Sequence, residues 1–196
     1  MISRLRGILL SRDFSTIEVE TSGGVVYEVE VPLTVEERLP AVGEAVELRT
    51  VQVTREDSVS LYGFLTANER ELFKRVLTAS GVGAKLALSM LSAFSARRLA
   101  QALAEKDLVA LTQVSGVGKK KAERIVLELS EKVQDLALAP EGTSGLPPGV
   151  GEAVAALVSL GFTFTDADAA VRIAFKKSGD LSTEELIREA LSGQSS

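Results

Sequence analysis

Cysteine, histidine and tryptophan are all absent from the 196 residues of this chain. Without cysteine there is no disulfide framework and no thiolate metal site. Without histidine the chain lacks the commonest general base, the commonest metal ligand and every Ser-His or Cys-His nucleophile pair. We therefore predict a protein with no catalytic residues, no metal site and no cofactor of its own.

Long apolar runs are also missing. No uninterrupted stretch approaches the roughly 20 residues that a membrane helix needs, and residues 1–7 lack the apolar region of a signal peptide. We therefore expect a soluble, cytoplasmic protein with no membrane partner. A hydrophobic content of 45% is enough to bury one core or to build two or three small domains.

The net charge of −5 is unevenly distributed along the chain. Residues 1–64 carry 6 basic and 11 acidic side chains, residues 65–139 carry 12 and 8, and residues 140–196 carry 4 and 8. Only the middle segment is basic. An acidic protein with one basic module is expected to bind a polyanion through one face.

The basic segment contains the tetrapeptide Ser-Gly-Val-Gly twice, at Ser80–Gly83 and Ser115–Gly118. Each copy lies between stretches of helical periodicity and is followed by lysine. Glycine adopts positive φ without a steric penalty, so we expect a tight reversal at these glycines, Gly118 included. The free amides of the following helix would then point outward and bind a phosphate. Two such turns predict a helix-hairpin-helix module that binds DNA.

Simpler explanations exist for each part of this motif. A glycine pair between helices is usually a helix end, and a lysine run is usually a solvated surface. The exact repetition, with cations after both copies, favours phosphate binding. The candidate DNA-binding residues are Gly81, Gly83, Lys85, Gly116, Gly118, Lys119, Lys120 and Arg124.

Residues 1–64 have the pattern of a small β-barrel. Strand-like stretches lie at 2–10, 16–20, 25–31, 45–54 and 58–64, with a short helical turn at 34–39. Five short strands in about sixty residues favour a Greek-key barrel of the OB type. Its four aromatic residues are expected in the core, which makes the barrel a weak nucleic-acid site; they are Phe14, Tyr27, Tyr62 and Phe64.

The turn between the last two strands carries Glu56 and Asp57. Acidic residues are common in turns, and turn chemistry alone explains them. Beside a DNA-binding module there is a second interpretation, in which the carboxylates repel phosphates and separate strands.

The C-terminal third begins with a sequence typical of a tether. Residues 139–149 hold three of the five prolines and three glycines, which favours a flexible linker. Three helical patterns follow at 151–160, 165–176 and 182–191, the last opened by a capping-box-like Ser182 and Glu185. We predict an α+β multidomain protein: an OB-type barrel (1–64), an all-α tandem helix-hairpin-helix domain (65–138), a linker (139–149) and a three-helix, UBA-like docking domain (150–196).

In this order the segments resemble the RuvA family of bacterial Holliday junction branch migration proteins, over essentially the whole chain. The most specific strings are Leu5-Arg6-Gly7, Arg55-Glu56-Asp57 with Leu61-Tyr62-Gly63-Phe64, the two Ser-Gly-Val-Gly turns, and Glu152-Ala153-Val154-Ala155-Ala156-Leu157. The chain departs from the family pattern at Ala84 and Ser115, where proline is usual, and at Lys121, where threonine is usual. Proline there only preorganises the turn, so we expect phosphate binding to persist.

The resemblance implies a non-catalytic subunit that acts on four-way junction DNA in recombination, DNA repair and the SOS response to DNA damage. Four copies would assemble through their barrels, and the Glu56–Asp57 turns would meet at the crossover as an acidic pin. A separate RuvB-type ATPase would use ATP and Mg as the motor, since no segment of this chain fits a phosphate-binding P-loop.

The same resemblance implies that the motor contacts the C-terminal domain. Leu157, Leu160 and Phe162 are the candidate docking residues, and Leu160-Gly161-Phe162 is similar to the loop of ubiquitin-associated domains. A RuvC-type resolvase is a further candidate partner. The sequence leaves open whether the homotetramer pairs into an octamer.

Two other classes of function compete with this interpretation. A helix-hairpin-helix DNA glycosylase would need a catalytic lysine or aspartate after the hairpin and a pocket for a flipped base. Asp135 is the one acid nearby beyond Glu131, and aromatic residues are few. An OB and helix-hairpin-helix adaptor without junction specificity is the second alternative, and the Glu56–Asp57 turn argues against it.

Overall fold

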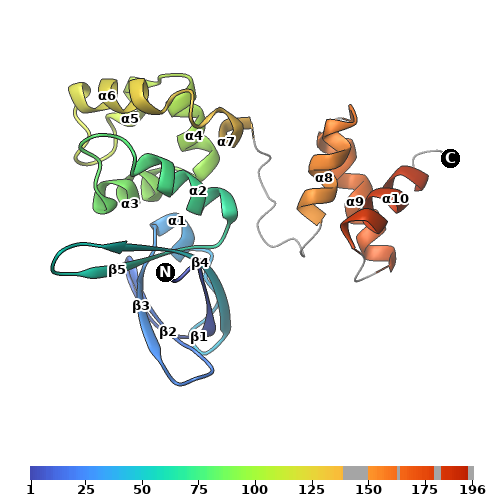
Figure 1. Ribbon diagram of the computed structural model, residues 1–196, viewed down its shortest axis with the longest axis horizontal. Coiled ribbons are helices and arrows are strands. Elements are labelled where there is room, and N and C mark those ends of the chain that lie inside the picture. The colour runs from blue at the N-terminus through green and yellow to red at the C-terminus, as the bar shows by residue number, and fades with distance from the viewer. Residues whose placement is uncertain (139–149, 163, 179–181, 194–196) are drawn as a thin grey trace. The chain divides into compact units, whose positions relative to one another are not determined.

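The computed structural model describes residues 1–138, 150–162, 164–178 and 182–193 (Figure 1). The chain divides into two compact units, Met1–Ala139 and Pro140–Ser196. The predicted linker at 139–149 lies outside the described residues. Among the described helices, none combines the length and the apolar character that a membrane span requires.

The first unit begins with a closed five-stranded barrel. Its elements are β1 (Arg4–Asp13), β2 (Thr16–Glu20), β3 (Val26–Glu30), α1 (Leu33–Glu36), β4 (Ala45–Thr54) and β5 (Val59–Phe64). The strands follow the order β1-β2-β3-β5-β4 around the barrel. Strands β3 and β5 run parallel, and the other neighbours are antiparallel. The predicted OB-type barrel is thereby confirmed.

Alternation of apolar and polar residues forms the barrel interior. On β2, Ile17 and Val19 are fully buried, whereas Glu18 between them is exposed. This is the period of two that a sheet with one solvated face requires. Phe14 departs from the expectation for the aromatics: it sits at the β1–β2 turn with φ of 50° and 84% of its surface exposed.

Gly7 allows two strands to approach closely. A Cβ atom at this position would lie 2.0 Å from the carbonyl oxygen of Glu20 on β2. At this point β1 passes from pairing with β4 to pairing with β2. Any larger residue would push the strands apart, which explains why the Leu5-Arg6-Gly7 string needs glycine in the barrel.

Six helices complete the first unit and bury one continuous apolar core. They are α2 (Ala67–Val76), α3 (Ala84–Ala93), α4 (Ala96–Ala104), α5 (Leu108–Leu111), α6 (Lys119–Leu129) and α7 (Gln134–Leu138). The all-α prediction for this segment is confirmed.

The barrel and the helices share part of this core. Phe73 of α2 packs on Tyr62 and Phe64 of β5, with ring centroids 5.0 and 4.9 Å apart. Aromatic pairs at these distances add to the burial of apolar surface. The barrel and helical domains are therefore joined by apolar packing as well as by the chain.

Polar contacts also join the barrel to the helical domain. Arg38, after α1, forms an ion pair with Glu69 of α2, and Glu69 also completes a capping box with Thr66 at the start of that helix. The Thr34 hydroxyl of α1 donates to the carbonyl of Leu91 on α3 at 2.7 Å. These contacts fix the helices against the barrel.

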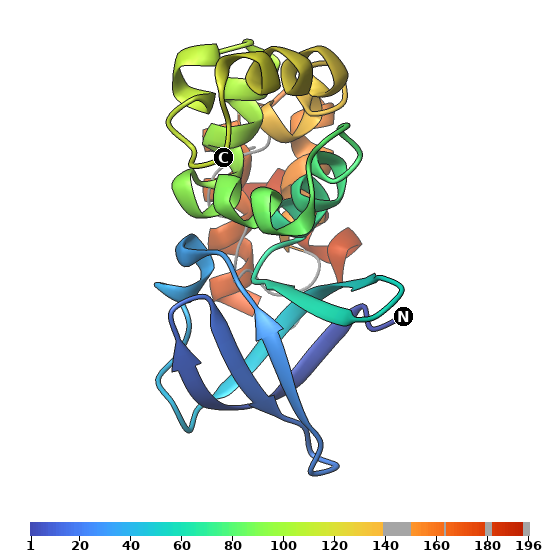
Figure 2. The same cartoon turned by 90° about the vertical axis from the view of Figure 1, so that its left-hand side faces the viewer.

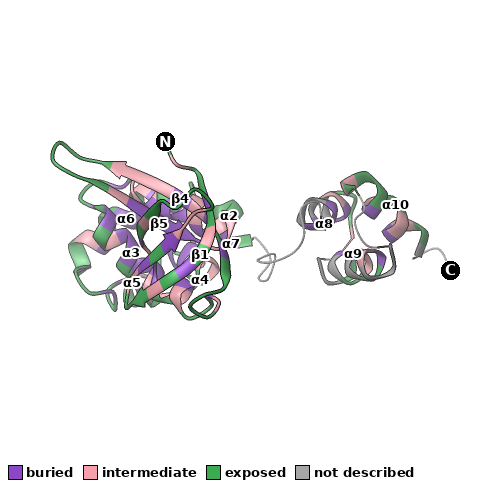
Figure 3. Ribbon diagram, turned by 90° about the horizontal axis from the view of Figure 1, so that it is seen from below, coloured by how far each residue is buried: buried purple, intermediate pink, exposed green. Residues whose placement is uncertain are grey.

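The second unit contains α8 (Val150–Ser159), α9 (Phe164–Ser178) and α10 (Thr183–Gly193) around a core of its own. Figure 3 shows buried residues in the interior of each unit. The predicted capping box before α10 is present: the Ser182 amide donates to Glu185 at 2.9 Å, and the Glu185 amide donates to the Ser182 hydroxyl at 3.4 Å. The three-helix prediction is confirmed.

Candidate nucleic-acid interface

The two Ser-Gly-Val-Gly turns have the same backbone conformation. The first glycine of each turn is left-handed, with φ of 79° at Gly81 and 86° at Gly116. The second glycine is extended and forms the N-cap of the following helix, with φ of −91° at Gly83 and −82° at Gly118. The expectation of positive φ at Gly118 is wrong, because the chain reverses one glycine earlier.

The helices that follow these turns begin without a side-chain cap. Three neighbouring helices are capped by a side chain that accepts a backbone amide; the capping residues are Thr66 for α2, Ser95 for α4 and Asp107 for α5. At α3 and α6 the N-cap glycine has no side chain to offer. The first-turn amides there lack a capping side chain, and such amides form an anion site together with the positive end of the helix dipole.

Space in front of the N-caps supports the same conclusion. A Cβ atom at Gly83 or at Gly118 would meet nothing within 4 Å. Neither their φ angles nor packing requires glycine at these two positions. A ligand that approaches the backbone closely would require it.

Cations surround both helix starts. Lys85, Lys119 and Lys120 are exposed and take part in no ion pair among the described residues. Positive charge in the first turn opposes the helix dipole by a few tenths of a kcal/mol. A bound polyanion would turn that penalty into an attraction.

Lys121 and Arg124 are engaged within the protein. The Lys121 ammonium donates to the carbonyl of Gly116 at 3.0 Å and closes the second turn onto its own helix. The Arg124 guanidinium pairs with Glu128 one helical turn further along, Nε to Oε1 at 3.1 Å. Of the predicted cations, Arg124 is therefore the one with an acidic partner.

Glu128 was not among the residues that the sequence singled out. Its second carboxylate oxygen accepts the backbone amide of Ser80 at 2.8 Å, at the start of the first turn. The Ser80 amide and the Arg124 guanidinium together hold the pKa of Glu128 below its ordinary value. The spacing of Arg124 and Glu128 is a helical pair visible in the sequence, but the contact with Ser80, 48 residues away, is not.

The acidic residues stand at the tip of a two-stranded arm. Strands β4 and β5 pair out to Thr54 and Val59, and the amide of Arg55 closes the turn on the carbonyl of Ser58 at 2.8 Å. Figure 2 shows the arm reaching beyond the rest of the barrel. Glu56 and Asp57 at its tip are exposed, and Asp57 accepts one bond from the Ser58 hydroxyl at 3.3 Å.

The base of this arm is held by the helical domain. Val51 and Val53 on β4 pack against the helical core. In Figure 1 the arm and the turns before α3 and α6 extend toward the same side of the unit. The geometry therefore offers two candidate phosphate sites and one pair of carboxylates on connected elements.

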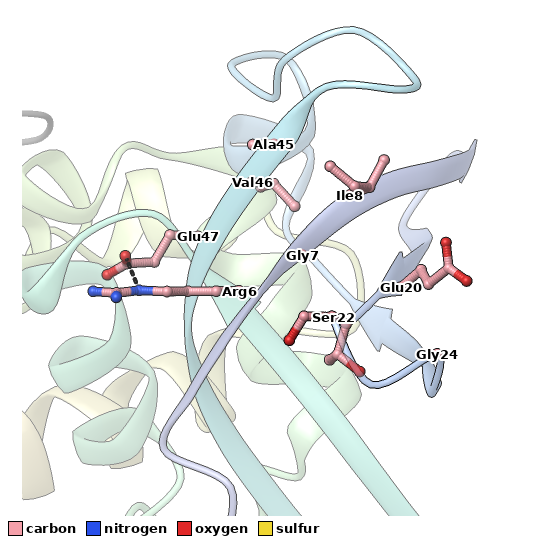
Figure 4. A pocket seen from close by; sticks show the side chains of 10 residues that line it. Arg6, Gly7, Ile8, Glu20, Ser22, Gly24, Ala45, Val46 and Glu47 are labelled. Carbon is pink, nitrogen blue, oxygen red and sulfur yellow. Dashed lines mark hydrogen bonds and ion pairs between the residues drawn. The ribbon is translucent and has the colours of Figure 1, made fainter.

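A groove of about 850 Å³ lies elsewhere, on the outside of the barrel between β1, β4 and the β2–β3 turn (Figure 4). Arg6 and Glu47 point toward each other across its wall and form an ion pair at 2.5 Å. None of the predicted site residues lines it. The described residues contain no group of three or more side chains that could hold a metal ion.

The candidate docking residues of the second unit differ in exposure. Leu160 is 65% exposed, and Phe162 packs partly against the core. Leu157 is 1% exposed, because it lies on the face of α8 that forms the three-helix core. Leu157 is therefore a core residue and not part of the surface. Ile173 on α9, which the sequence did not single out, is 67% exposed.

Comparison with known proteins gives the chain a family. Three protein-family models match it: RuvA N terminal domain at residues 1–63, SAM-like helix-hairpin-helix tandem at 73–131, and RuvA, C-terminal domain at 148–193. A protein of Gemmatimonas aurantiaca is 45% identical over 193 residues, which is 98% of each chain. A protein of Pseudomonas paraeruginosa is 41% identical over 202 residues, covering 98% of this chain and 99% of its own.

A protein of Nitrosococcus oceani is 42% identical over 200 residues, covering 97% of this chain and 98% of its own. All three relatives carry the name Holliday junction branch migration complex subunit RuvA. Identity above 40% over nearly the full length of both partners, together with the matched N- and C-terminal domains, shows that this chain belongs to the RuvA family.

Proposed function

We propose that this chain binds four-way (Holliday) DNA junctions in the cytoplasm and, with a separate ATPase, promotes branch migration during recombination and DNA repair. The observation that carries the proposal is the pair of glycine-capped helix starts, each flanked by lysine, within one compact unit. Two anion sites on one module suit the regularly spaced phosphates of a nucleic acid. The names of the relatives support the same function.

The hairpins would contact the DNA backbone alone. Gly81 and Gly116 reverse the chain, Gly83 and Gly118 leave the N-caps open to a ligand, and the backbone amides at these turns donate to phosphate oxygens. Lys85, Lys119 and Lys120 supply charge, and Arg124 does so while paired with Glu128. Phosphate contacts fix position and carry no base information, so the chain would recognise the shape of a junction and not its sequence.

The acidic tip would act by repulsion. In a homotetramer assembled through the barrels, four arms would bring four copies of Glu56 and Asp57 to the junction centre. Carboxylates at that point disfavour a closed duplex and leave room for separated strands to enter new arms. A tip that is exposed and held on an anchored arm has the geometry for this task.

The second unit would bind the motor. Leu160 and Ile173 place large apolar side chains on its surface, with Phe162 partly exposed beside Leu160. We propose that this surface contacts a RuvB-type ATPase, which alone uses ATP and Mg. A RuvC-type resolvase and a second tetramer, paired into an octamer, are further partners of the same proposal.

Gel shifts with a four-way junction and a linear duplex of equal length test the function. We expect tighter binding of the junction, a steep loss of affinity with salt, and a solution mass of four or eight times the 20.8 kDa chain. Two junctions of unrelated sequence should bind within about threefold of each other. Equal affinity for junction and duplex by a monomer would instead establish an adaptor without junction specificity.

A further inference from the structure

We infer that Glu128 is a positioning residue that fixes the first phosphate-binding turn relative to the second. The inference rests on the proposed function and names a residue that would set the spacing of its two hairpins. Glu128 belongs to α6, the helix of the second hairpin, and holds the backbone at the start of the first hairpin. One carboxylate thus connects the two sites.

Each oxygen of this carboxylate has its own partner. Oε2 accepts the Ser80 amide at 2.8 Å, and Oε1 accepts from Arg124 Nε at 3.1 Å. Ser80 directly precedes Gly81, the residue with φ of 79° where the chain reverses. The Glu128 side chain is 27% exposed, so these bonds are partly shielded from water. The carboxylate therefore restrains the first turn at the point where its direction is set.

The first hairpin also lies close to the second turn. A Cβ atom added at Gly116, in the second turn, would lie 3.5 Å from Leu86 Cδ1 on α3. The two hairpins are therefore near each other at both turns. The repeat interval of 35 residues places Ala93 where Glu128 would have its counterpart, so the sequence offers no matching carboxylate on α3.

Charge alone would predict the opposite role for Glu128. A carboxylate near bound phosphates repels them, and its removal should tighten DNA binding. If positioning dominates, removal of the Ser80 contact should weaken binding instead. The two explanations differ in sign, which makes them separable by variants that change charge and reach independently.

Four side chains at position 128 separate negative charge from reach, which is the length that lets a side-chain oxygen accept the Ser80 amide. Glutamate has both, Glu128→Gln keeps the reach without the charge, Glu128→Asp keeps the charge on a side chain one methylene shorter, and Glu128→Ala has neither. Glu123→Ala is the matched control, since it removes an exposed acid of the same helix that makes no ion pair or side-chain hydrogen bond among the described residues. All are tested as full chains for affinity to a four-way junction across a range of salt.

We expect affinity to follow reach. Glu128→Gln should bind within about twofold of the wild type or more tightly, and Glu128→Asp and Glu128→Ala should bind about tenfold more weakly, as expected for one lost hydrogen bond to a charged group. Their salt dependence should also be shallower, because a displaced hairpin neutralises fewer phosphates. Hydrogen exchange of a peptide spanning residues 78–83 should accelerate in the same two variants, and this readout does not depend on DNA.

Other orders of affinity overturn the inference. If Glu128→Gln is as weak as Glu128→Ala, the charge or the Arg124 pair matters and the Ser80 contact does not. If Glu128→Ala folds and binds as well as the wild type, the carboxylate positions nothing; if it fails to fold, the comparison of Glu128→Asp with Glu128→Gln decides. A wild type that bound junction and duplex equally would refute the proposed function itself. If the wild type prefers the junction but the affinities of the variants do not follow the expected order, this inference alone is refuted.

Discussion

At the scale of single residues, the two glycines of each turn meet different requirements. Gly116 has a backbone conformation that a side chain disfavours, with φ of 86°. Gly118 has an ordinary conformation and open space where a Cβ would project. The first glycine therefore serves the fold, and the second, under the proposed function, serves the ligand.

This difference predicts that alanine at Gly116 lowers stability, whereas alanine at Gly118 lowers DNA affinity. Gly116→Ala should lower the free energy of unfolding by about 1–2 kcal/mol, because L-residues are strained at positive φ. Gly118→Ala should change stability by less than about 0.5 kcal/mol, since the N-cap preference and the reduced chain entropy offset each other. It should nevertheless weaken junction binding about tenfold, because the methyl group blocks a close phosphate.

Urea denaturation and gel shifts on the same samples measure both effects. Gly23→Ala is the control, because that exposed glycine also has open space around its Cβ position and no positive φ. Normal junction binding by Gly118→Ala would show that no phosphate approaches the N-cap of α6.

The acidic tip gives a second prediction at this scale. Glu56→Gln with Asp57→Asn removes two charges from exposed side chains, and neither carboxylate forms an ion pair with any residue that the structure describes. Repulsion between a carboxylate and a phosphate at a few ångströms amounts to about 1–4 kcal/mol before screening. The double variant should therefore bind linear duplex at least about threefold more tightly at low salt, with junction preference reduced.

The measurement is a gel shift of the wild type and the double variant on junction and linear duplex at two salt concentrations. A tip that only forms a turn would leave both affinities unchanged. Weaker binding to either DNA would also contradict a repulsive role.

At the scale of helices, Arg75 joins the end of the helical domain to its beginning. From α2 it donates to Asp135 of α7, with Nη1–Oδ1 at 2.5 Å and Nη2–Oδ2 at 3.0 Å. It also donates to the carbonyl of Lys132 and pairs with Glu71 on its own helix. Bidentate pairs of this kind are geometrically specific, so α7 is fixed against α2.

The ion pair between Arg75 and Asp135 should make the free energy of unfolding depend on pH. The Arg75 guanidinium holds the pKa of Asp135 below its ordinary value, against partial desolvation that acts to raise it. A depressed pKa in the folded state contributes stability above the unfolded value of about 3.9, and this contribution disappears as the pH falls through the folded value. Asp135→Asn should therefore be less stable than the wild type at pH 7, and the difference should vanish near pH 2.

Urea denaturation at a series of pH values measures this difference. Because Asp135 is well exposed, we expect no more than about 1 kcal/mol at pH 7. Glu131→Gln is the control, since the Glu131 side chain pairs with nothing among the described residues. A difference that persisted at low pH would assign the effect to helix propensity rather than to the ion pair.

The sequence predicts the elements well because their signals are local. Alternation along residues 16–20 and 45–54 marks strands whose ends the structure reproduces. Periodic apolar residues, including Ala122 and Ile125, mark α6. Each of these signals is contained within one element and needs no knowledge of its neighbours.

The parts that the sequence does not predict depend on contacts between distant segments. Nothing local tells Gly116 from Gly118, because the conformation of a turn follows from where the flanking helices must pack. Ser80 and Glu128 are 48 residues apart, and Arg75 and Asp135 are 60 apart. The sequence alone does not tell whether Leu157 lies in the core or on the surface, because that depends on which helices pack against α8.

At the scale of the whole molecule, the chain is divided into a unit that would hold DNA and a unit that would hold a partner. Each has its own apolar core. Units with separate cores can fold independently. The proposed roles can therefore be separated by cutting the chain.

A chain that ends at Ala139 should keep its fold and its junction affinity within about twofold, because the first unit contains every proposed DNA contact. It should lose branch migration driven by a RuvB-type ATPase. Gel shifts and a strand-exchange assay with the ATPase measure the two properties. Branch migration at the normal rate by the shortened chain would refute the docking role of the second unit.

Exposure predicts which residues of the second unit contact the ATPase. Leu160→Asp should leave the unit folded, because Leu160 is 65% exposed, and should lower stimulation of the ATPase several-fold. Leu157→Asp should unfold the unit, since an uncompensated charge cannot be buried in its core. Circular dichroism of the variants and ATPase assays with junction DNA measure both. Full stimulation by a folded Leu160→Asp chain would exclude Leu160 from the docking surface.

The anchored arm has a mechanical consequence. Val51 and Val53 of β4 pack against the helical core, and Phe73 packs on Tyr62 and Phe64 of β5, the second strand of the arm. To bend the arm, a duplex would have to pull packed side chains out of the apolar core. If the tip is the wedge that we propose, it is a stationary wedge that stores no energy and performs no stroke. All the work of opening base pairs then enters through the DNA as it is drawn past the tip.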